Sequence, residues 1–487
     1  FFVSGSLSGH VSVPIDGMFR AEVCYGRGPR KGVANLKLTF MGATRTVTGS
    51  KYLVESAGRS ILVDCGLFQG LKDLRLRNWA PLPVAPGEID AVILTHAHLD
   101  HSGYVPLLVK NGFKGPVYCS EATRDLCAIL LPDSGYLQEA DADRANRHAY
   151  SKHKPALPLY TEAEARRSLD RFKPVDFGQD TALADGLSFG LSRSGHILGS
   201  AFVTMVEEGT RLVFSGDLGR PDDPVMKSPA EIQEADYLVV ESTYGDRLHR
   251  DGDPQAKIGK IIRETAARGG TVVIPAFAVG RSQAILYYIH ELKQAGEIPD
   301  IPVFLDSPMA INATRLLNDH GEDHRLSDAE WARVCGVARY VNTAEESRAL
   351  DDGPGMPQVI ISASGMATGG RVLHHLKHYI GDPRNTILFT GFQAAGTRGA
   401  RLIHGEDEIK IHGRMWPVRA EVDVLHNASA HADYREILDW LGHFRDPPRH
   451  TFVTHGEEEA ATSLAMKIGE HLGWDVSVPD YLDSADL

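Results

Sequence analysis

The chain has 487 residues, which exceeds one ordinary hydrophobic core and predicts two or three domains or one large domain with an insert. Its hydrophobic content of 43% and charged content of 24% are ordinary for a soluble globular protein. No apolar run approaches the roughly 20 residues that span a bilayer, so we expect no membrane contact. The net charge of −13 counts against a general nucleic-acid binder, because attraction to phosphates needs basic surface, but it allows a local basic groove.

The cysteines and the first residues indicate the cellular setting. Five cysteines form no CxxC pair and are odd in number, which argues against a disulfide framework or a cysteine-type structural zinc and favours the reducing cytoplasm. They are Cys24, Cys65, Cys119, Cys127 and Cys335. Residues 1–35 contain no charged segment followed by an apolar stretch, so a secretory signal is not visible, and we interpret them as an N-terminal extension.

The first half of the chain alternates short β-branched runs with glycine-rich turns, a pattern typical of strands. The expected strands cover 36–40, 51–54, 60–63, 91–94, 116–119, 202–206 and 211–214. Helical periodicity appears at 120–131 and 161–171. The polar stretch 132–158 lies between these helices and is expected to be a covering segment with one helix, not a core element.

From residue 236 the pattern changes to alternating strands and helices. The expected strands are 237–240, 271–275, 301–305, 358–362 and 386–390, and the expected helices are 256–268, 282–294 and 372–379. Such alternation predicts an α/β fold with a mostly parallel sheet flanked by helices. Short strands return at 409–412, 420–425 and 450–453, followed by a helix at 457–472 and a strand at 476–478. The simplest organisation is one domain that is interrupted by a second.

A cluster of metal-binding side chains follows the expected strand 91–94. His96, His98, Asp100 and His101 lie within six positions. Imidazole nitrogens and carboxylate oxygens are zinc ligands, and a strand that breaks into a loop can spread them around two cations. A lone histidine would usually be structural, but three histidines and an aspartate in this spacing predict a metal site.

Two metal sites need more ligands, and three other strand ends supply them. His196 follows the alternating run 187–191, Asp217 follows the strand 211–214, and His455 follows the strand 450–453. Small residues beside each one allow backbone and metal to approach closely. Asp64 also ends a strand. It is expected to orient a ligating imidazole by contacting it, without binding the metal itself. Each alone could be an ordinary turn residue, but together they predict a dinuclear site.

These residues resemble, in order and context, the motifs of the metallo-β-lactamases. The matching positions are Asp64, residues 96–101, His196 and Asp217. The chain beyond them resembles the β-CASP branch, whose members process nucleic acids. Glu241 looks like its motif A acid, His431 like its motif B histidine and His455 like its motif C histidine. The resemblance covers residues 36–480.

The resemblance implies a metallo-β-lactamase αββα sandwich with an inserted β-CASP domain. The first part of the sandwich would occupy 36–237, the β-CASP domain 238–400, and the second part of the sandwich, with motifs B and C, 401–487.

The resemblance also implies a zinc-dependent ribonuclease that cleaves single-stranded RNA with a two-metal-activated hydroxide, as an endonuclease or a 5′ exonuclease. A histidine at motif C accompanies RNA processing in the family, so His455 favours RNA over DNA. One Zn²⁺ would take His96, His98 and His196, the other would take Asp100, His101 and His455, and Asp217 would bridge them. His431 would protonate the leaving oxygen with Glu241 as its partner, and Asp100 would also serve catalysis.

Glycine-rich segments in the inserted part are expected to bind substrate, because backbone N–H groups at a helix start form an anion site. The candidates are Ser364 and Gly365 in 362–370, Thr397 and Arg398 in 391–399, and, more weakly, Arg281 in 279–283. Other histidines have no partner spacing and are expected at the surface. They are His374, His375, His378, His404 and His412.

Two alternatives stay open. The metal cluster alone would also serve a hydrolase of a small ester or thioester, although such a substrate needs neither the insert nor Glu241 and His431. A non-catalytic scaffold is the other alternative, but here every ligand position is filled. The cleavage mode, the RNA preference, the choice of zinc or manganese and the oligomeric state, including a homodimer, are left open, and no protein partner is inferred.

Overall fold

The computed structural model describes residues 36–148, 151–249, 252–352, 355–391, 393, 396–425 and 427–487. The expected extension 1–35, including Cys24, lies outside these residues. The described residues belong to one compact unit. Within these ranges each helix is too short or too polar to cross a lipid bilayer.

The first sheet has seven strands in the order β22-β1-β2-β3-β4-β5-β6. They are β1 (Lys37–Phe40), β2 (Tyr52–Ser56), β3 (Arg59–Val63), β4 (Ala91–Ile93), β5 (Val117–Cys119), β6 (Phe172–Pro174) and β22 (Ser484–Asp486). The four strands from β22 to β3 pair antiparallel, and the strands from β3 to β6 pair parallel. The carboxyl ends of β3 and β4 therefore lie at the same edge.

The second sheet also has seven strands, in the order β21-β20-β11-β10-β9-β8-β7. They are β7 (Asp180–Ala184), β8 (Leu187–Arg193), β9 (Ala201–Glu207), β10 (Thr210–Phe214), β11 (Tyr237–Glu241), β20 (His450–Thr454) and β21 (Val476–Ser477). The strands β10, β11 and β20 run parallel, and β8 shares their direction because it pairs antiparallel with β9, which pairs antiparallel with β10. All four carboxyl ends therefore meet at one edge.

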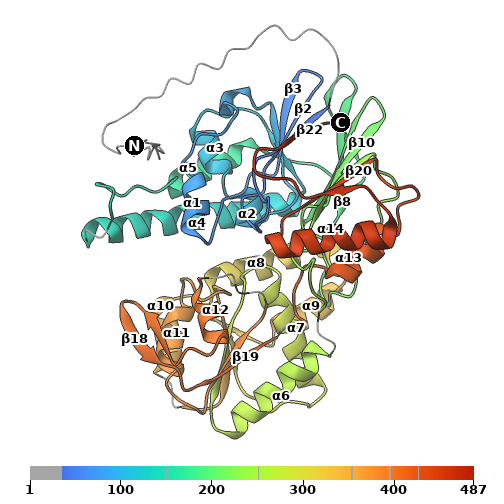
Figure 1. Ribbon diagram of the computed structural model, residues 1–487. Helices are drawn as coiled ribbons and strands as arrows, with labels where there is room; N and C mark the ends of the chain where they lie inside the picture. The colour runs from blue at the N-terminus through green and yellow to red at the C-terminus, as the bar shows by residue number, and fades with distance from the viewer. Residues whose placement is uncertain are drawn as a thin grey trace, which may run out of the picture. The chain divides into compact units, whose positions relative to one another are not determined.

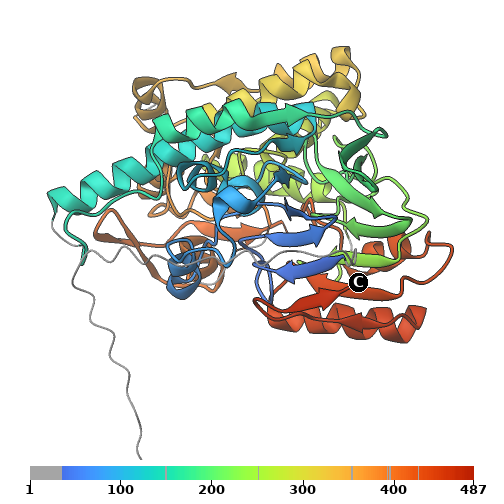
Figure 2. The same cartoon turned by 90° about the horizontal axis from the view of Figure 1, so that it is seen from above.

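The two sheets pack face to face, as Figure 2 shows for the blue and green strands. Phe40, Val63, Phe189, Phe214 and Val239 are among the buried side chains between them. Alternate residues of each strand point to opposite faces, so the outer faces also need cover. Burial of each such side chain contributes about 1.5–3 kcal/mol.

Helices cover both outer faces. The first sheet packs against α2 (Leu99–Ser102), α3 (Val105–Lys110), α4 (Glu121–Arg147) and α5 (Glu162–Ser168). The second packs against α13 (Tyr434–Leu441) and α14 (Glu458–Leu472). This arrangement confirms the expected αββα sandwich.

The helix α4 differs from the prediction. It begins after Ser120, whose side chain accepts a hydrogen bond from the Thr123 amide, and it continues through Pro132 to Arg147. A proline inside a helix removes one backbone hydrogen bond, but Pro132 and Gly135 are buried, and a Cβ on Gly135 would lie 2.7 Å from the Glu162 backbone. Close packing of α4 on α5 offsets the lost bond. The expected helix end at residue 131 was therefore wrong, because the helix expected within 132–158 is the continuation of the first one.

The third sheet is entirely parallel, with the order β14-β13-β15-β12-β16-β19, which confirms the expected mostly parallel sheet. Its strands are β12 (Thr271–Pro275), β13 (Val303–Leu305), β14 (Arg339–Tyr340), β15 (Gln358–Ser362), β16 (Thr386–Phe389) and β19 (Glu421–Val424). The strand β19 thus joins this sheet from beyond residue 400.

Helices cover both faces of the third sheet, in the light green to orange part of Figure 1. They are α6 (Pro254–Ala267), α7 (Arg281–Gln294), α8 (Pro308–Asp319), α9 (Asp328–Cys335), α10 (Ala344–Asp351), α11 (Val372–Tyr379) and α12 (Arg398–Ile403). The remaining elements are α1 (Lys72–Arg77), the hairpin of β17 (Glu408–Ile411) and β18 (Arg414–Pro417), and the 3₁₀ turns Pro86–Glu88, Leu169–Arg171 and Gly321–Asp323.

Candidate active site

The predicted ligands come together because their strands end at the facing edges of the two central sheets. Asp64 follows β3, residues 96–101 follow β4, His196 follows β8, Asp217 follows β10, Glu241 ends β11 and His455 follows β20. The loops also approach closely. A Cβ on Gly66 would lie only 1.6 Å from the Asp100 carbonyl oxygen, so this position admits only glycine.

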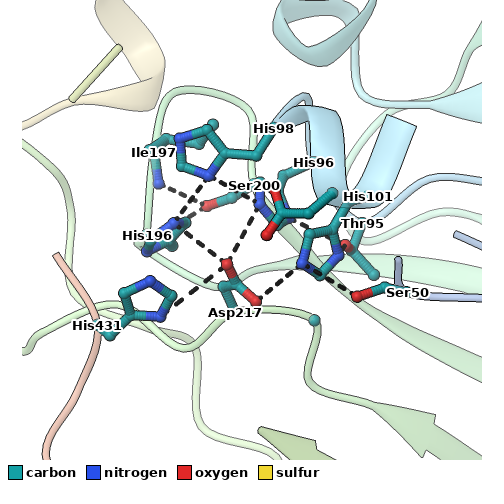
Figure 3. Close-up of polar contacts among 12 residues, drawn as sticks. Ser50, Thr95, His96, His98, His101, His196, Ile197, Ser200, Asp217 and His431 are labelled. Carbon is teal, nitrogen blue, oxygen red and sulfur yellow. Dashed lines mark hydrogen bonds and ion pairs between the residues drawn. The ribbon is translucent and has the colours of Figure 1, made fainter. Parts of the chain in front are cut away.

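Three histidines and Asp217 form the first candidate ligand group. The Nδ1 atom of His98 lies 3.1 Å from His96 Nε2 and 3.2 Å from His196 Nε2. The Oδ2 atom of Asp217 lies 3.4 Å from both His96 Nε2 and His196 Nε2. Figure 3 shows the Asp217 carboxylate between the rings, with His196 and His431 on one side and His101 on the other.

Asp100, His101 and His455 form the second group. The Nε2 atoms of His101 and His455 are 3.0 Å apart, and His455 Nε2 lies 3.5 Å from Asp100 Oδ2. The Oδ1 atom of Asp217 is 3.1 Å from His101 Nε2 and 3.5 Å from His455 Nδ1. The two oxygens of one carboxylate therefore face the two groups.

The chemistry of these atoms fits divalent cations. His98 Nδ1 faces two other ring nitrogens, although one neutral imidazole has a single N–H and can satisfy only one such contact. Among the residues that the structure describes, the buried His196 Nδ1 and Asp217 Oδ1 atoms have no hydrogen-bond partner. Converging nitrogen and carboxylate lone pairs in a buried pocket are what a divalent metal requires.

Burial keeps the nitrogen donors of the first group available, whereas Asp217 and Asp64 raise the pKa of His101 in the second group against the effect of burial. Burial lowers the pKa of His96 to about 3 and also lowers the pKa values of His98 and His196, so these rings are neutral. Burial opposes ionisation of Asp217, but His101 and His455 hold its pKa well below the usual range. Neutral imidazoles and an ionised carboxylate are the protonation states that bind a metal.

Asp64 lies behind His101 rather than in either ligand group. Its Oδ2 atom is 2.8 Å from His101 Nδ1, and its Oδ1 atom accepts a hydrogen bond from the Thr95 amide at 2.8 Å. The Thr95 hydroxyl also donates to the carboxylate. A proton on His101 Nδ1 is thereby directed to Asp64, and the lone pair of Nε2 faces Asp217 and His455. Sequence reasoning missed Thr95, which adjoins the predicted motif.

His431 and Glu241 form a separate pair beside the first group. His431 Nδ1 lies 3.1 and 3.2 Å from the two Glu241 carboxylate oxygens and 3.9 Å from Asp217 Oδ2. Glu241 is buried and accepts a hydrogen bond from the Leu218 amide at 2.7 Å. Burial disfavours the charged imidazole, but Glu241 and Asp217 raise the pKa of His431 to about 9. The ring is therefore protonated at neutral pH.

The predicted substrate loops lie at the carboxyl edge of the third sheet, after β12, β15 and β16. They contact one another: Gln393 Nε2 donates to the Gly365 carbonyl at 3.1 Å, and a Cβ on Gly365 would lie 2.8 Å from the Phe277 ring. A Cβ on Gly280 would lie 3.1 Å from Ile197, the neighbour of His196. The carboxyl edge of an open parallel sheet, where ligands commonly bind, thus adjoins the candidate metal centre.

Individual loop residues differ in what they contact. The Ser364 hydroxyl accepts from the Thr368 amide, and Thr397 caps α12 by accepting from the Ala400 amide. The Arg398 guanidinium donates to three backbone carbonyls, those of Lys410, Ala367 and Thr368. Phe277, which the sequence reasoning did not select, is an exposed aromatic side chain at this edge.

His375 was predicted at the surface, and this prediction was wrong. The side chain is fully buried, with Nε2 2.7 Å from Asp306 and Nδ1 2.7 Å from Asp351. Burial opposes its charge, but the two carboxylates raise its pKa to about 9. The carboxylates lie 69 and 24 positions away in the sequence, so spacing could not reveal them. The other four histidines, His374, His378, His404 and His412, are exposed as expected.

A four-layer sandwich with a buried histidine and aspartate cluster at its strand ends defines a metal-dependent hydrolase of the metallo-β-lactamase fold. The family model of the metallo-beta-lactamase superfamily matches residues 45–258, that of the Beta-Casp domain matches 282–402, and that of the Zn-dependent metallo-hydrolase RNA specificity domain matches 415–479. The chain therefore binds divalent metal through a catalytic fold that is interrupted by a Beta-Casp insert.

Relatives agree with these matches. Ribonuclease TTHA0252 of Thermus thermophilus is 39% identical over 437 residues, which cover 88% of this chain and 95% of the relative. Transcription termination factor FttA of Methanosarcina mazei is 32% identical over 470 residues, which cover 90% of this chain and 69% of the relative. The chain belongs to the β-CASP family of metallo-β-lactamase-fold ribonucleases.

A solved structure shows the same fold at low sequence identity. The crystal structure of a protein of unknown function from Enterococcus faecalis superposes with a TM-score of 0.53 and 13% identity, and covers 93% of this chain and all of that one. This likeness concerns the fold alone.

Proposed function

We propose that the protein hydrolyses phosphodiester bonds of single-stranded RNA with the help of two Zn²⁺ ions. The observation that carries this proposal is the Asp217 carboxylate, whose two oxygens face two separate ligand groups, with the His431–Glu241 pair beside them. The named ribonuclease among the relatives and the RNA specificity domain support RNA as the substrate.

Seven side chains would hold the metals. One ion would be bound by His96, His98 and His196. The other would be bound by Asp100, His101 and His455, and Asp217 would bind both ions. Two divalent ions held in this way activate water and offset negative charge on a phosphoryl group. Asp64 would keep His101 in the tautomer that presents Nε2 to the metal.

His431 would act as the general acid. When the bond between phosphorus and the 3′-oxygen breaks, that oxygen takes the imidazolium proton, and His431 regains a proton from solvent. Glu241 keeps the ring protonated and oriented through its contacts with Nδ1. Asp100 would support the reaction through its place beside His455.

The RNA strand would lie along the carboxyl edge of the third sheet. The loops with Ser364, Gly365, Thr397 and Arg398 would shape this path, either by direct contact or, for Arg398, by fixing the loops. We propose that the chain divides into 1–35, 36–237, 238–400 and 401–487, with β19 of the last segment completing the insert's sheet. A cytoplasmic location is supported by the free state of the four described cysteines.

Digestion of single-stranded RNA labelled at either end tests the proposal. Wild-type protein should cleave it, with mononucleotides from a 5′ label indicating an exonuclease and internal fragments an endonuclease. Asp217→Ala should abolish cleavage while circular dichroism and melting temperature show a folded protein. Full-rate cleavage by this variant, or faster turnover of a thioester than of RNA by the wild type, would overturn the proposal.

A further inference from the structure

The Arg281 side chain is buried next to the candidate metal centre, and among the described residues no carboxylate forms an ion pair with it. It is 8% exposed, and its Nε and Nη1 atoms have no hydrogen-bond partner in the part of the chain that the structure describes. Burial of a charged group costs free energy unless hydrogen bonds or an opposite charge offset the loss of water. The guanidinium therefore has unused donors in a place where unused donors are costly.

Arg281 lines a cavity that opens beside the proposed catalytic residues. His196 and Ala430, the residue before His431, form part of its wall. Apolar side chains such as Leu198 and Val279 form much of the rest. Arg281 is the one lysine or arginine among the described residues that line this cavity. A ligand in the cavity would thus lie against both the guanidinium and His196.

The position of Arg281 in its helix adds to the positive potential. It is the first residue of the 14-residue helix α7, after Gly280 in a left-handed conformation with a φ of 79°. The N-terminus of a helix carries a partial positive charge, which disfavours a cation and attracts an anion. The loop before it is closed, because the Ser282 amide and hydroxyl both donate to the Phe277 carbonyl. The helix N-terminus and the guanidinium are both positive, so together they favour the binding of an anion.

The loop after β16 borders another side of the guanidinium. A Cβ on Gly391 would lie 3.6 Å from Arg281 Nη2, so the backbone after β16 lies against the guanidinium. The strands β12 and β16 are neighbours, and Arg281 thus belongs to the same sheet edge as the predicted substrate loops.

Asp223 is the carboxylate that could explain Arg281 without a ligand. It lines the same cavity, but its Oδ1 atom accepts hydrogen bonds from the Val225 and Met226 amides, at 2.8 and 2.7 Å. No ion pair joins it to Arg281 among the described residues. Burial raises the pKa of Asp223 and lowers that of Arg281, and the attraction between the two charges offsets only part of each shift. A bridging water is the competing explanation.

We infer that Arg281 binds a phosphate of the RNA strand adjacent to the scissile one, which makes the cavity beside His196 a phosphate subsite. This inference rests on the proposed function. The catalytic side chains include the carboxylates of Asp100, Asp217 and Glu241, which repel a phosphate backbone, and the whole chain carries a net charge of −13. A buried guanidinium supplies local attraction and a forked donor pair that fits phosphate oxygens.

The test measures equilibrium binding of fluorescein-labelled single-stranded RNA to metal-loaded protein across a series of KCl concentrations. All proteins carry His431→Ala to suppress cleavage. Arg281→Met should weaken binding roughly 10- to 100-fold, since hydrogen bonds to charged groups are the strong ones. It should also reduce the slope of log K against log salt by about 0.7, the value for one phosphate contact on a single strand. Arg281→Lys should recover part of the RNA affinity and part of the salt slope.

Arg263→Met is the matched control, because it removes an exposed arginine on α6 whose Nη1 atom donates to the Glu297 carbonyl. This control should change neither the affinity for RNA nor the slope of log K against log salt. Wild-type affinity and slope in Arg281→Met would overturn the inference. Asp223→Asn combined with Arg281→Met tests the water-bridged pair: if this double variant regains both melting temperature and RNA affinity, Arg281 serves Asp223 and the inference is wrong.

A further arm separates this inference from the proposed function. If the wild type neither binds nor cleaves RNA, the proposed function fails. Calorimetric titration of inorganic phosphate into chelator-treated protein then decides on the anion site alone. Phosphate binding that is lost in Arg281→Met supports the subsite, and equal or absent binding in both proteins contradicts it.

Discussion

Replacement of Asp64 by asparagine should weaken one metal site and leave the other intact. The Asp64 carboxylate accepts from the Thr95 amide and hydroxyl and lies 2.8 Å from His101 Nδ1. In Asp64→Asn, the amide oxygen can still accept from Thr95, but its NH₂ group then faces His101 Nδ1. His101 Nδ1 must then accept a hydrogen bond, so the ring carries its proton on Nε2. That proton occupies the lone pair that the metal needs.

The size of the effect follows from this geometry. Loss of a carboxylate that orients a metal-ligating histidine typically costs 10- to 100-fold in metal affinity or activity, about 1.4–2.7 kcal/mol. The backbone should not add to this cost, because Asp64 has a φ of 58° and asparagine tolerates the left-handed region well. Asp64→Ala would add strain of roughly 1–3 kcal/mol at the same position, which makes asparagine the cleaner variant.

Competition with a chromogenic chelator measures the affinity of each metal equivalent. In Asp64→Asn, one equivalent should dissociate at 10- to 100-fold lower chelator concentration than in the wild type, and the other should be unchanged. RNA cleavage should fall in parallel and recover with excess metal. Two unchanged affinities, or an equal weakening of both, would refute the assignment of Asp64 to His101.

Three further outcomes are expected. Glu241→Gln should lower kcat for RNA by roughly 10²- to 10⁴-fold with RNA affinity nearly unchanged, because it weakens the general acid His431; an unchanged kcat in single-turnover assays would contradict this. Because the pKa of His375 is raised to about 9 in the folded state, its pairing with Asp306 and Asp351 should stabilise the protein by about 3 kcal/mol below pH 6.5, and this effect should be lost as pH rises through 9. Urea unfolding of the wild type and His375→Gln should converge above pH 9, and a constant difference would count against it. Phe277→Ala should reduce single-stranded RNA affinity roughly tenfold, since base stacking on an aromatic ring contributes about 1–3 kcal/mol, whereas unchanged affinity would exclude stacking there.

Much of the fold could be predicted because its strands are short, buried and bounded by turn residues. The β12 and β15 strands match the predicted ranges 271–275 and 358–362, and the ligands were found because each one follows a strand. Parallel strands that end at one edge turn a sequence pattern into a spatial cluster. For this reason, residues as distant as His101 and His455 could be placed in one dinuclear site, while their assignment to the same metal came from the family resemblance; their ring nitrogens lie 3.0 Å apart.

The features that sequence reasoning missed depend on contacts between distant segments. Pro132 looks like a helix end, and only the close packing of α4 on α5 explains why the helix continues. His375 looks like an exposed helix residue until Asp306 and Asp351 are placed beside it. Arg281 was only a weaker candidate from its glycine turn, because its burial and its lack of a hydrogen-bond partner among the described residues are visible only once its surroundings are known.

Stepwise addition of Zn²⁺ to chelator-treated protein, with single-stranded RNA cleavage measured at each step, tests the central claim most directly. The claim is that Asp217 joins two metal sites which act together on RNA. Cleavage should be absent without metal and rise to a plateau at two equivalents per chain, and Asp217→Asn should not reach that plateau. Cleavage by the metal-free protein, or a plateau at one equivalent, would contradict the account.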